Sequence, residues 1–573
     1  MAQRNRRLTW RLALLMFALL VGTGGIVVRL VQVQIIDHEY YAAQADEEHL
    51  HRTVVRATRG AILDRNGFPL ATTVGTFDVY IDPRSWSDIS VARRSADTLG
   101  PLLGRSPDEL LAEALQFDAG DYLAARSVSS QVGLQLFELA PAGVRLVKTS
   151  KRSYPEGDLA STLLGFMGRD QVGLAGVEAA FDVELGGVAT EIYFERDGLG
   201  NPIPFGRSFG EEPVAGGDIH LTIDRYLQRL IENKLNQEIE RHGATGGTII
   251  VMDPDTGEVL AMTSQPSFRL SQLDLESEDQ AELFRPRAVT DVYPPGSVMK
   301  TLTMATAIDL GLVGPGTTYL DSGIAEVEGG EPIKNWDFSA HGMTTMTELL
   351  QFSLNTGAVW LARFIGANQF YDYIGRFGFE DRTRVGLGGD PTGIVRTHKD
   401  DDWYPIDLAT NSFGQGISVT PLHMITAVSS LVNGGLLMQP YIVKQVASEN
   451  GPRTFDPVVV RRVISQETSR TMVQMMNAVV DGMPTHGAQV AGLSVGGKTG
   501  TTTFPNSTAT IASFVGFAPA PDPQFIMLVK IDSPQTSPLG GVVAAPIFKD
   551  LAPQIIAYLG AQSGNLAFVE RGP

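Results

Sequence analysis

An uncharged run near the N-terminus places the strongest constraint on how this chain can fold. From Leu12 to Val28 the sequence holds about 17 residues without a charge, close to the shortest length that spans a bilayer. Apolar residues continue to Ile36 in place of the small-residue cleavage site of a secretory signal peptide, which is the alternative interpretation. We therefore expect residues 12–36 to form an uncleaved, single-pass anchor with its juxtamembrane segment.

The charge in front of this run predicts its orientation. Arg4, Arg6, Arg7 and Arg11 precede the anchor, and basic residues stay on the cytoplasmic side of a membrane helix. Residues 1–11 are thus expected to form a cytoplasmic tail. Everything beyond the anchor is expected to lie outside the cytoplasm.

Composition limits the remaining possibilities. With 573 residues, the chain is too long for one ordinary domain. The formal net charge of −19 argues against a nucleic-acid partner, which would need a basic face. The absence of cysteine excludes disulfides, thiol catalysis and thiolate metal sites. The nine histidines are scattered without the spacing of a zinc peptidase, so no metal is expected.

Residues 37–220 have the pattern of a separate, mixed α/β domain. Arg59 to Gly67 predicts a strand that enters an Asn-Gly turn, which is the signal of a hairpin. A further strand is expected from Phe77 to Ile81, and helical structure from Ala92 to Gln116. This segment holds no recognisable set of catalytic side chains. A binding or spacing domain is therefore expected here.

Residues 221–573 show a different pattern. Leu221 to Ile223 predicts a short strand, and Asp224 can cap a following helix that has one apolar face. Two β-rich runs, from Gly247 to Met252 and from Val259 to Met262, are joined by a Pro/Gly turn and predict a hairpin. Strands packed with helices and interrupted by a long helical insertion indicate an α+β domain.

The segment Tyr293 to Leu302 lies in that insertion and carries the first candidate site. Its two prolines and its glycine break regular structure, so a helix is expected to start at Ser297. Ser297 would then lie in the first helical turn, where free N–H groups favour a developing anion. Lys300 projects from the same face and can reach the serine hydroxyl. The alternative is a helix-capping serine followed by a solvated lysine, a common combination in large proteins.

Two further stretches carry candidate site residues. Ser353 and Asn355 lie between two helical patterns, where a cap and a turn former are the plain alternative. Lys498 is flanked by glycine and followed by hydroxyl residues, so donors can approach an anion closely. Gly492 to Thr499 also fits the phosphate-loop pattern of nucleotide-binding proteins. The residues that follow, GTTTFPNST, are not typical of the helix that such a loop requires.

Together these residues resemble a known family. Three motifs, in their order and spacing, resemble the active-site motifs of the penicillin-binding proteins and serine β-lactamases. They are Ser297-x-x-Lys300, Ser353-x-Asn355 and Lys498-Thr499-Gly500. Other segments extend the resemblance over most of the chain and are similar to class B penicillin-binding proteins, namely RGAILDRNG, RSYPEGDLAS, GLAGVE, LTIDRYLQ, MDPDTGEVLAM, SFGQGISVTP and FVGFAP.

The resemblance implies an architecture and a reaction. The implied fold is α+β, with an N-terminal transmembrane helix, a mixed α/β pedestal over residues 37–220 and a transpeptidase domain over residues 221–573. The latter would combine an antiparallel sheet flanked by helices with an all-helical subdomain. The implied activity is that of a serine-type D-Ala-D-Ala transpeptidase, which cross-links peptidoglycan stem peptides through an acyl-enzyme and is the target of β-lactams. No cofactor or metal is implied.

The resemblance also implies roles for the motif residues. Ser297 is the implied nucleophile, and Lys300, buried beside a second cation, is its base. Ser353 passes a proton to the leaving amine, and Asn355 holds Lys300 and the substrate amide. Backbone N–H groups of Ser297 and Thr501 form the oxyanion hole. Lys498 is the catalytic cation that anchors the substrate carboxylate, and the substrate-binding residues are Thr499, Gly500 and Thr501.

The implied biological setting is the inner membrane, with the catalytic domain in the periplasm. The Ser-x-Asn form of the middle motif and the chain length favour the division-septum transpeptidase over the elongation type. The expected partners are a SEDS-family glycosyltransferase and other division proteins, and Gly22, Gly24 and Gly25 offer a small-residue face for a neighbouring helix. The alternatives are an elongation-type enzyme, a β-lactam sensor or hydrolase on the same fold, and a membrane-anchored scaffold whose site has decayed.

Overall fold

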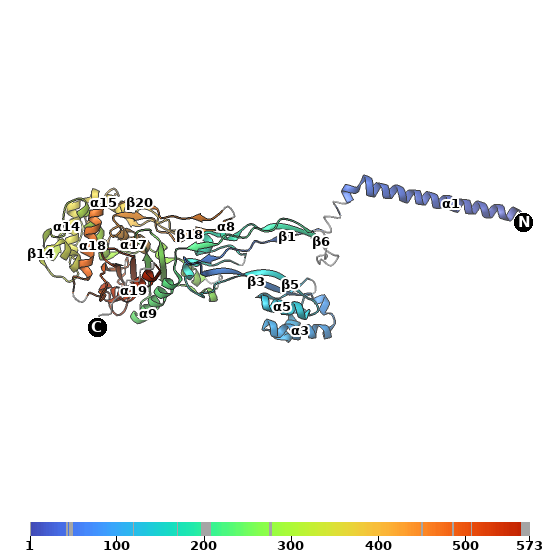
Figure 1. Cartoon of the computed structure of the whole chain (residues 1–573), viewed down its shortest axis with the longest axis horizontal. Coiled ribbons are helices and arrows are strands. Elements are labelled where there is room, and N and C mark those ends of the chain that lie inside the picture. Colours follow the sequence, from blue (N-terminus) through green and yellow to red (C-terminus); the bar gives the residue numbers. More distant parts are fainter. Residues whose placement is uncertain are drawn as a thin grey trace. The chain divides into compact units, whose positions relative to one another are not determined.

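The computed structural model describes residues 2–41, 44, 50–117, 120–168, 170–195, 208–273, 278–448, 451–483, 486–505 and 507–562. Figure 1 shows the chain coloured along its sequence. The chain divides into two compact units. The first comprises Met1–Thr58 and Gly187–Ala215, and the second comprises Arg59–Gly186 and Gly216–Pro573.

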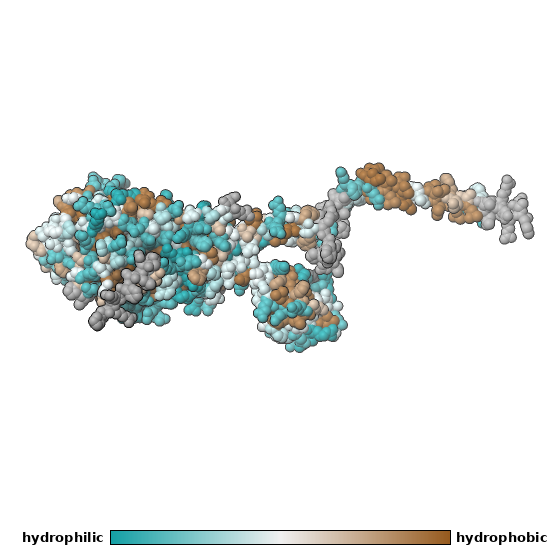
Figure 2. Space-filling model, viewed as in Figure 1, coloured by the Kyte–Doolittle hydropathy of each residue, from teal (hydrophilic) through white to brown (hydrophobic). Residues whose placement is uncertain are grey.

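The first unit contains the helix expected as an anchor. Helix α1 (Ala2–Val31) passes directly into a π-helical turn, η1 (Gln32–Ile36). Together they provide an apolar stretch of 27 residues, Trp10–Ile36, that is long enough to cross a membrane and is not buried against the rest of the chain. Figure 2 shows hydrophobic residues along this helix. The side chains of Arg4, Arg6 and Arg7 lie outside the described part of the chain.

Three strands complete the first unit. β1 (Leu50–Val55) pairs antiparallel with β6 (Thr190–Glu195), and β6 pairs antiparallel with β7 (Ser208–Phe209). The aromatic rings of Tyr193 and Phe209 stack across the second pair. This small sheet thus joins the two chain segments that form the first unit.

The second unit contains a seven-stranded sheet in the order β19-β18-β8-β2-β3-β4, with β5 paired to β3. The expected hairpin is confirmed, because β2 and β3 pair antiparallel on either side of the Asn66-Gly67 turn. β8 pairs in parallel with β2 and antiparallel with β18, so this sheet combines strands from both of the expected domains. The strands are β2 (Ile62–Leu63), β3 (Pro69–Ile81), β4 (Tyr122–Ser129), β5 (Val144–Ser153), β8 (Ile219–Leu221), β18 (Val443–Val446) and β19 (Arg453–Thr454).

The region expected to be helical from Ala92 to Gln116 consists of two helices, α3 (Ile89–Leu103) and α4 (Pro107–Ala114). Gly104 ends the first in a left-handed conformation, and Pro107 occupies the first turn of the second. Both helices pack with β3 and β4 around a small core. The other short helices of this region are η2 (Pro83–Trp86), α5 (Ser130–Leu139), α6 (Ser161–Leu164), α7 (Gly176–Ala180) and α8 (Asp182–Gly186).

A five-stranded antiparallel sheet organises the rest of the second unit in the order β10-β9-β23-β22-β21. The expected β9–β10 hairpin is confirmed. Ile249 and Val251 pack with helices α9 and α19 on one face, whereas Ile250 faces the larger core on the other. The elements are α9 (Arg225–His242), β9 (Gly246–Met252), β10 (Val259–Gln265), β21 (Gly496–Thr503), β22 (Thr510–Ala518), β23 (Phe525–Asp532) and α19 (Gly540–Gln562).

Helices α9 and α19 both pack on the five-stranded sheet. Oδ1 of Asp224 accepts hydrogen bonds from the N–H groups of Tyr226 and Leu227, so Asp224 caps α9 as expected. α19 is long and apolar enough to cross a membrane, but 44% of its apolar window is buried. Since it packs on the sheet, α19 is a core helix.

The residues between β10 and β21 form a mainly helical layer. Together with the antiparallel sheet, this layer confirms the expected α+β fold. Its helices are η3 (Leu270–Gln272), α10 (Glu278–Ala281), η4 (Glu282–Phe284), α11 (Arg287–Thr290), η5 (Gly296–Val298), α12 (Met299–Asp309), α13 (Met346–Phe352), α14 (Asn355–Ile365), α15 (Ala367–Arg376), α16 (Pro405–Ser412), α17 (Pro421–Ser429) and α18 (Gln466–Val480). The layer also contains four two-stranded sheets. They pair β11 (Thr318–Asp321) with β14 (Gly342–Thr345), β12 (Ile324–Ala325) with β13 (Ile333–Lys334), β15 (Ile394–Val395) with β16 (Ile417–Ser418), and β17 (Leu436–Met438) with β20 (Val459–Arg462).

Candidate active site

Ser297 lies in a tight turn shaped by the residues before it. Tyr293 is buried and exchanges two backbone hydrogen bonds with Val419, with N···O distances of 2.9 and 3.0 Å. Gly296 has a φ of +59°, a left-handed conformation that glycine tolerates. Ser297 consequently sits in the 3₁₀ turn η5, and the α-helix α12 begins at Met299. The helix start expected at Ser297 is confirmed to within one residue, because a 3₁₀ turn begins at Gly296 and passes directly into α12.

Lys300 lies in the first turn of α12 and is the centre of the site. Its Nζ is 3.1 Å from Oγ of Ser297 and 2.7 Å from Oδ1 of Asn355. The same Nζ is 2.5 Å from the backbone O of Ser353 and 3.3 Å from its Oγ. Lys300 is only 1% exposed. Burial, assisted by the charge of Lys498, lowers the pKa of Lys300 well below its ordinary value.

These contacts determine how a neutral Lys300 amine distributes its hydrogen atoms. A neutral amine has two N–H donors and one lone pair. The backbone O of Ser353 and Oδ1 of Asn355 can only accept, so they take both donors. The lone pair is left for a hydroxyl, and Oγ of Ser297 is closer than Oγ of Ser353. The arrangement can therefore transfer the Ser297 proton to Lys300.

Ser353 and Asn355 reach Lys300 from the junction of two helices. α13 ends at Ser353, whose φ of +57° is uncommon for a residue with a side chain. In this conformation Oγ of Ser353 lies 3.1 Å from Nζ of Lys498 while its backbone O contacts Lys300. Asn355 begins α14, and its Nδ2 donates to the backbone O of Lys334 at 2.9 Å. That bond orients the amide so that Oδ1 faces Lys300.

Lys498 comes from β21, an edge strand of the five-stranded sheet. It is 1% exposed, and burial lowers its pKa to about 7. Repulsion between the two buried amines favours the state in which Lys498 is charged and Lys300 is neutral. Residues Gly496–Thr503 form a strand, so the helix that a phosphate loop needs after its lysine does not form here, and the nucleotide interpretation is excluded.

The other predicted residues of this strand differ in their positions. Thr499 and Thr501 line the same cavity as Ser297. Gly500 is not among the lining residues. A Cβ at Gly500 would lie 2.3 Å from Oγ of Ser513 and 2.9 Å from the backbone O of Pro295. Glycine at this position therefore allows β21 to pack closely against the Ser297 turn.

Five of the motif residues line a cavity of about 690 Å³, namely Ser297, Ser353, Asn355, Lys498 and Thr499. Sequence analysis missed the aromatic residues that line this cavity. They include Trp336, Phe338, His341, Phe352, Phe413 and His486. The available signal was two aromatic residues in the polar run from Asn335 to Ser339. Burial and the charge of Lys498 lower the pKa of His486 to about 4, so this imidazole is neutral at neutral pH.

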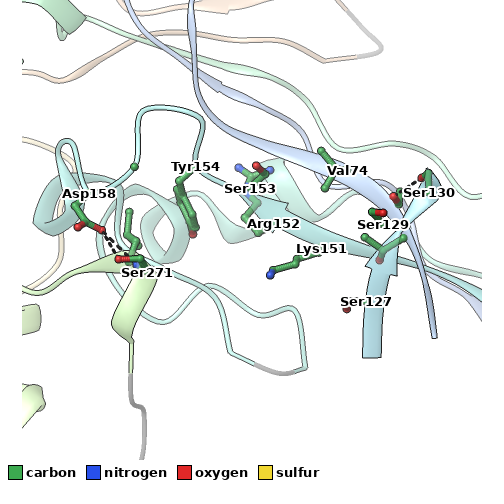
Figure 3. A pocket seen from close by; sticks show the side chains of 14 residues that line it. Val74, Ser127, Ser129, Ser130, Lys151, Arg152, Ser153, Tyr154, Asp158 and Ser271 are labelled. Carbon is green, nitrogen blue, oxygen red and sulfur yellow. Dashed lines mark hydrogen bonds between the residues drawn. The ribbon is translucent and has the colours of Figure 1, made fainter. Parts of the chain in front are cut away.

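A second cavity, of about 640 Å³, lies among β3, β4 and β5 (Figure 3). Hydroxyl side chains predominate among its lining residues, and its charged residues are Lys151, Arg152 and Asp158. Ser271 donates to Asp158 at 3.3 Å, as the figure shows. Since the lining residues include none of the motif residues, we take the first cavity as the candidate active site.

Comparisons with known proteins identify the family of this chain. Residues 247–552 match the family described as penicillin binding protein transpeptidase domain, and residues 54–221 match the penicillin-binding protein dimerisation domain. The chain is 33% identical over 563 residues to Stage V sporulation protein D of Bacillus subtilis, covering 96% of this chain and 86% of that protein. It is 32% identical over 554 residues to Peptidoglycan D,D-transpeptidase FtsI of Escherichia coli, covering 94% and 90%.

Solved structures show the same likeness. Penicillin Binding Protein 2X from Streptococcus thermophilus matches with a TM-score of 0.75 and 25% identity, over 90% of this chain and 82% of that one. A peptidoglycan synthetase from Bifidobacterium adolescentis matches with a TM-score of 0.71 and 25% identity, over 91% and 98%. The transpeptidase match contains all three motifs, and the relatives align with nearly the whole chain. This chain therefore belongs to the class B penicillin-binding proteins, a family of D,D-transpeptidases.

Proposed function

We propose that this protein is a serine D,D-transpeptidase that cross-links the stem peptides of septal peptidoglycan. The contact between Ser297 and Lys300 carries the proposal, because it places a nucleophilic hydroxyl 3.1 Å from a buried amine whose pKa is lowered. The matching transpeptidase domain and the likeness to a peptidoglycan D,D-transpeptidase support the class of reaction.

Acylation of Ser297 is the first half-reaction. Its Oγ attacks the carbonyl carbon of the penultimate D-alanine, and its proton passes to the lone pair of Lys300. Backbone N–H groups of Ser297 and Thr501 stabilise the oxyanion that forms. When the C–N bond breaks, the leaving amine takes a proton from Oγ of Ser353, which recovers one from Lys300 across 3.3 Å. The terminal D-alanine leaves, and Ser297 holds the acyl group as an ester.

The remaining motif residues bind the substrate. Charged Lys498 attracts the terminal carboxylate of the donor, and a bound carboxylate in turn favours the charged form of this lysine. The hydroxyls of Thr499 and Thr501 donate to the same carboxylate, while the amide of Asn355 contacts the substrate amide. Gly500 contributes by letting β21 approach the turn. In the second half-reaction an amine of a neighbouring stem peptide attacks the ester, and Ser297 regains its proton.

Covalent labelling tests this proposal. A fluorescent penicillin should acylate the full-length protein in membranes, and mass spectrometry should locate the adduct on Ser297. Ser297→Ala should abolish labelling because it removes the nucleophile. Ser90→Ala, an exposed serine in the first turn of α3, is the matched control and should label normally. Labelling that persists in Ser297→Ala would contradict the proposal.

The septal role and the membrane setting need separate tests. The Ser-x-Asn motif and the chain length support the septal role over the elongation role, and helix α1 supports a single-pass anchor with the catalytic domain outside the cytoplasm. A fluorescent fusion should gather at midcell; a signal along the side wall would favour elongation. A SEDS-family glycosyltransferase should co-purify with the protein, and Gly22→Leu and Gly25→Leu should weaken that association by blocking close helix packing.

A further inference from the structure

The turn at Ser353 has a conformation that its own residue type does not favour. Its φ of +57° lies in the left-handed region, which a residue with a side chain adopts only when its surroundings hold it there. Both oxygens that Ser353 presents to Lys300 depend on this conformation. The contacts that hold the turn are therefore part of the active-site construction.

Residues 334–341, which begin at the last residue of β13, supply contacts on both sides of this turn. The backbone O of Lys334 accepts from Nδ2 of Asn355 at 2.9 Å. Nε1 of Trp336 donates to the backbone O of Phe352 at 2.9 Å. One contact orients the amide that holds Lys300, and the other fixes the residue immediately before Ser353.

Asn335 is the buried member of this segment, with 1% exposure. Its Oδ1 accepts from the backbone N–H of Thr356 at 3.2 Å and lies 3.0 Å from Oγ1 of Thr356. Its Nδ2 donates to Oδ2 of Asp321 at 2.9 Å and to the backbone O of Ser339 at 3.0 Å. The amide thus ties the segment to the first turn of α14, next to Asn355.

Asp321, at the end of β11, connects residues 335 and 341 of this segment to Thr356 in α14. It is 1% exposed. Its Oδ2 accepts from Nδ2 of Asn335 and from the backbone N–H of His341, each at 2.9 Å. Its Oδ1 accepts from the Thr356 hydroxyl at 2.5 Å and from the backbone N–H of Gly323 at 3.2 Å. All four partners are donors, which suits a carboxylate because it only accepts.

We infer that Asp321 is a positioning residue for the acylation of Ser297. None of its four partners is a motif residue, so it acts through them. Asn335 and Thr356 set the start of α14 and hence the amide of Asn355. That amide occupies one N–H of Lys300 and leaves the lone pair directed at Ser297. The inference rests on the proposed function and adds to it a residue one layer behind the motifs.

Asp321→Asn tests this role. The variant keeps the side-chain size but places an NH₂ group against a donor. Stopped-flow acylation by a fluorescent penicillin gives the acylation rate constant, the dissociation constant of the non-covalent complex and the final fraction labelled. We expect the rate constant to fall about 10- to 100-fold, as a displacement approaching 1 Å does. The dissociation constant should stay within about threefold. A purely structural role would lower the fraction labelled and leave the rate constant unchanged.

Asp309→Asn is the matched control. The carboxylate of Asp309 also accepts from several donors, with the Ser465 N–H at 2.7 Å, the Thr468 hydroxyl at 2.9 Å and the Tyr373 hydroxyl at 2.6 Å. These partners connect α12 to α15 and to the start of α18, and none of the three hydrogen bonds involves the Ser353 turn. The acylation rate constant of this variant should stay within about twofold of wild type. Equal slowing in both variants would overturn the inference.

A second variant keeps the test decisive if Asp321→Asn does not fold. Thr356→Val removes one hydroxyl that donates to Asp321 and preserves the side-chain volume. Its acylation should be about 3- to 10-fold slower. If wild type is not acylated at Ser297, the proposed function itself fails. If wild type is acylated and the folded variants keep its rate constant, only the positioning role of Asp321 is overturned.

Discussion

Gly296→Ala tests whether the Ser297 turn must lie close against β21. Gly296 has a φ of +59°, and alanine in this left-handed region costs about 1–2 kcal/mol. An alanine Cβ would also lie 2.9 Å from the backbone O of Thr501 and 3.3 Å from Cβ of Thr502. Carbon and oxygen atoms in contact are normally about 3.3 Å apart or more, so the turn must move by about 0.4 Å.

This displacement changes the distance between the backbone N–H groups of Ser297 and Thr501, which we propose as the oxyanion hole. A misplacement of about 1 Å in a reacting geometry costs about 100-fold in rate, so about 0.4 Å corresponds to about 5- to 10-fold. We therefore expect the acylation rate constant of Gly296→Ala to fall by that factor. The free energy of unfolding should fall by about 1–2 kcal/mol from backbone strain. Stopped-flow acylation by a fluorescent penicillin and urea unfolding measure the two effects.

Gly311→Ala separates strain from displacement. Gly311 follows the same helix, α12, and has a φ of +69°, but a Cβ there would meet no atom within 4 Å. This variant should lose similar stability and acylate at the wild-type rate. If Gly296→Ala acylates as fast as Gly311→Ala, the reasoning about the turn is refuted.

Three further predictions concern buried charge. The second-order acylation rate constant should fall as pH rises through about 7, where Lys498 loses its proton, and a profile that stays flat from about pH 6 to 9 would contradict this assignment. At lower pH the rate constant should also fall as Lys300 becomes protonated. Lys498→Met should abolish labelling yet raise the free energy of unfolding near neutral pH. The free energy of unfolding of the wild type should rise above pH 7, because the unfolded chain then binds a proton that the folded chain has lost. Equilibrium unfolding at several pH values checks the direction of both changes. Glu178→Gln should lower the free energy of unfolding by about 3–5 kcal/mol, because the fully buried Glu178 accepts at 2.7 Å from Nε of both Arg59 and Arg152. Glu113→Gln, at a half-exposed ion pair with Arg105, should change it far less.

Local signals predicted much of the fold. The Asn66-Gly67 turn predicted the β2–β3 hairpin, and Asp224 predicted the start of α9, because both depend on neighbouring residues alone. The 3₁₀ form of the turn that holds Ser297 could not be predicted, since the left-handed Gly296 packs against Thr501 and donates to the backbone O of Gly414, two residues that are distant in sequence. The parallel pairing of β2 with β8 could not be predicted from the sequence either, because it joins distant segments whose residue patterns do not identify each other as partners.

The candidate site also contains residues that the sequence predicts and residues that it does not. Ser297, Lys300, Ser353, Asn355 and Lys498 could be selected because their spacing forms motifs, and the structure brings their side chains within hydrogen-bond distance. The residues behind them form no motif. Asp321 ends the short strand β11 and Asn335 follows the short strand β13, and what joins them to the site is a set of tertiary hydrogen bonds with no sequence period. Their roles can be argued only from the assembled structure.

The partners of the two lysines explain why this site can use an amine as a base. Among the described residues, the contacts of Lys300 and Lys498 are hydroxyl, amide and carbonyl oxygens, and neither lysine forms an ion pair with a carboxylate. A carboxylate at 2.7 Å would favour the charged amine and cancel the effect of burial. Neutral acceptors hold the N–H groups in place but favour the charge less, so burial prevails and the pKa of Lys300 stays low. The carboxylate of Asp321 is kept one layer away and occupied by four donors, where it can orient the amide partners of the site without restoring the proton to Lys300.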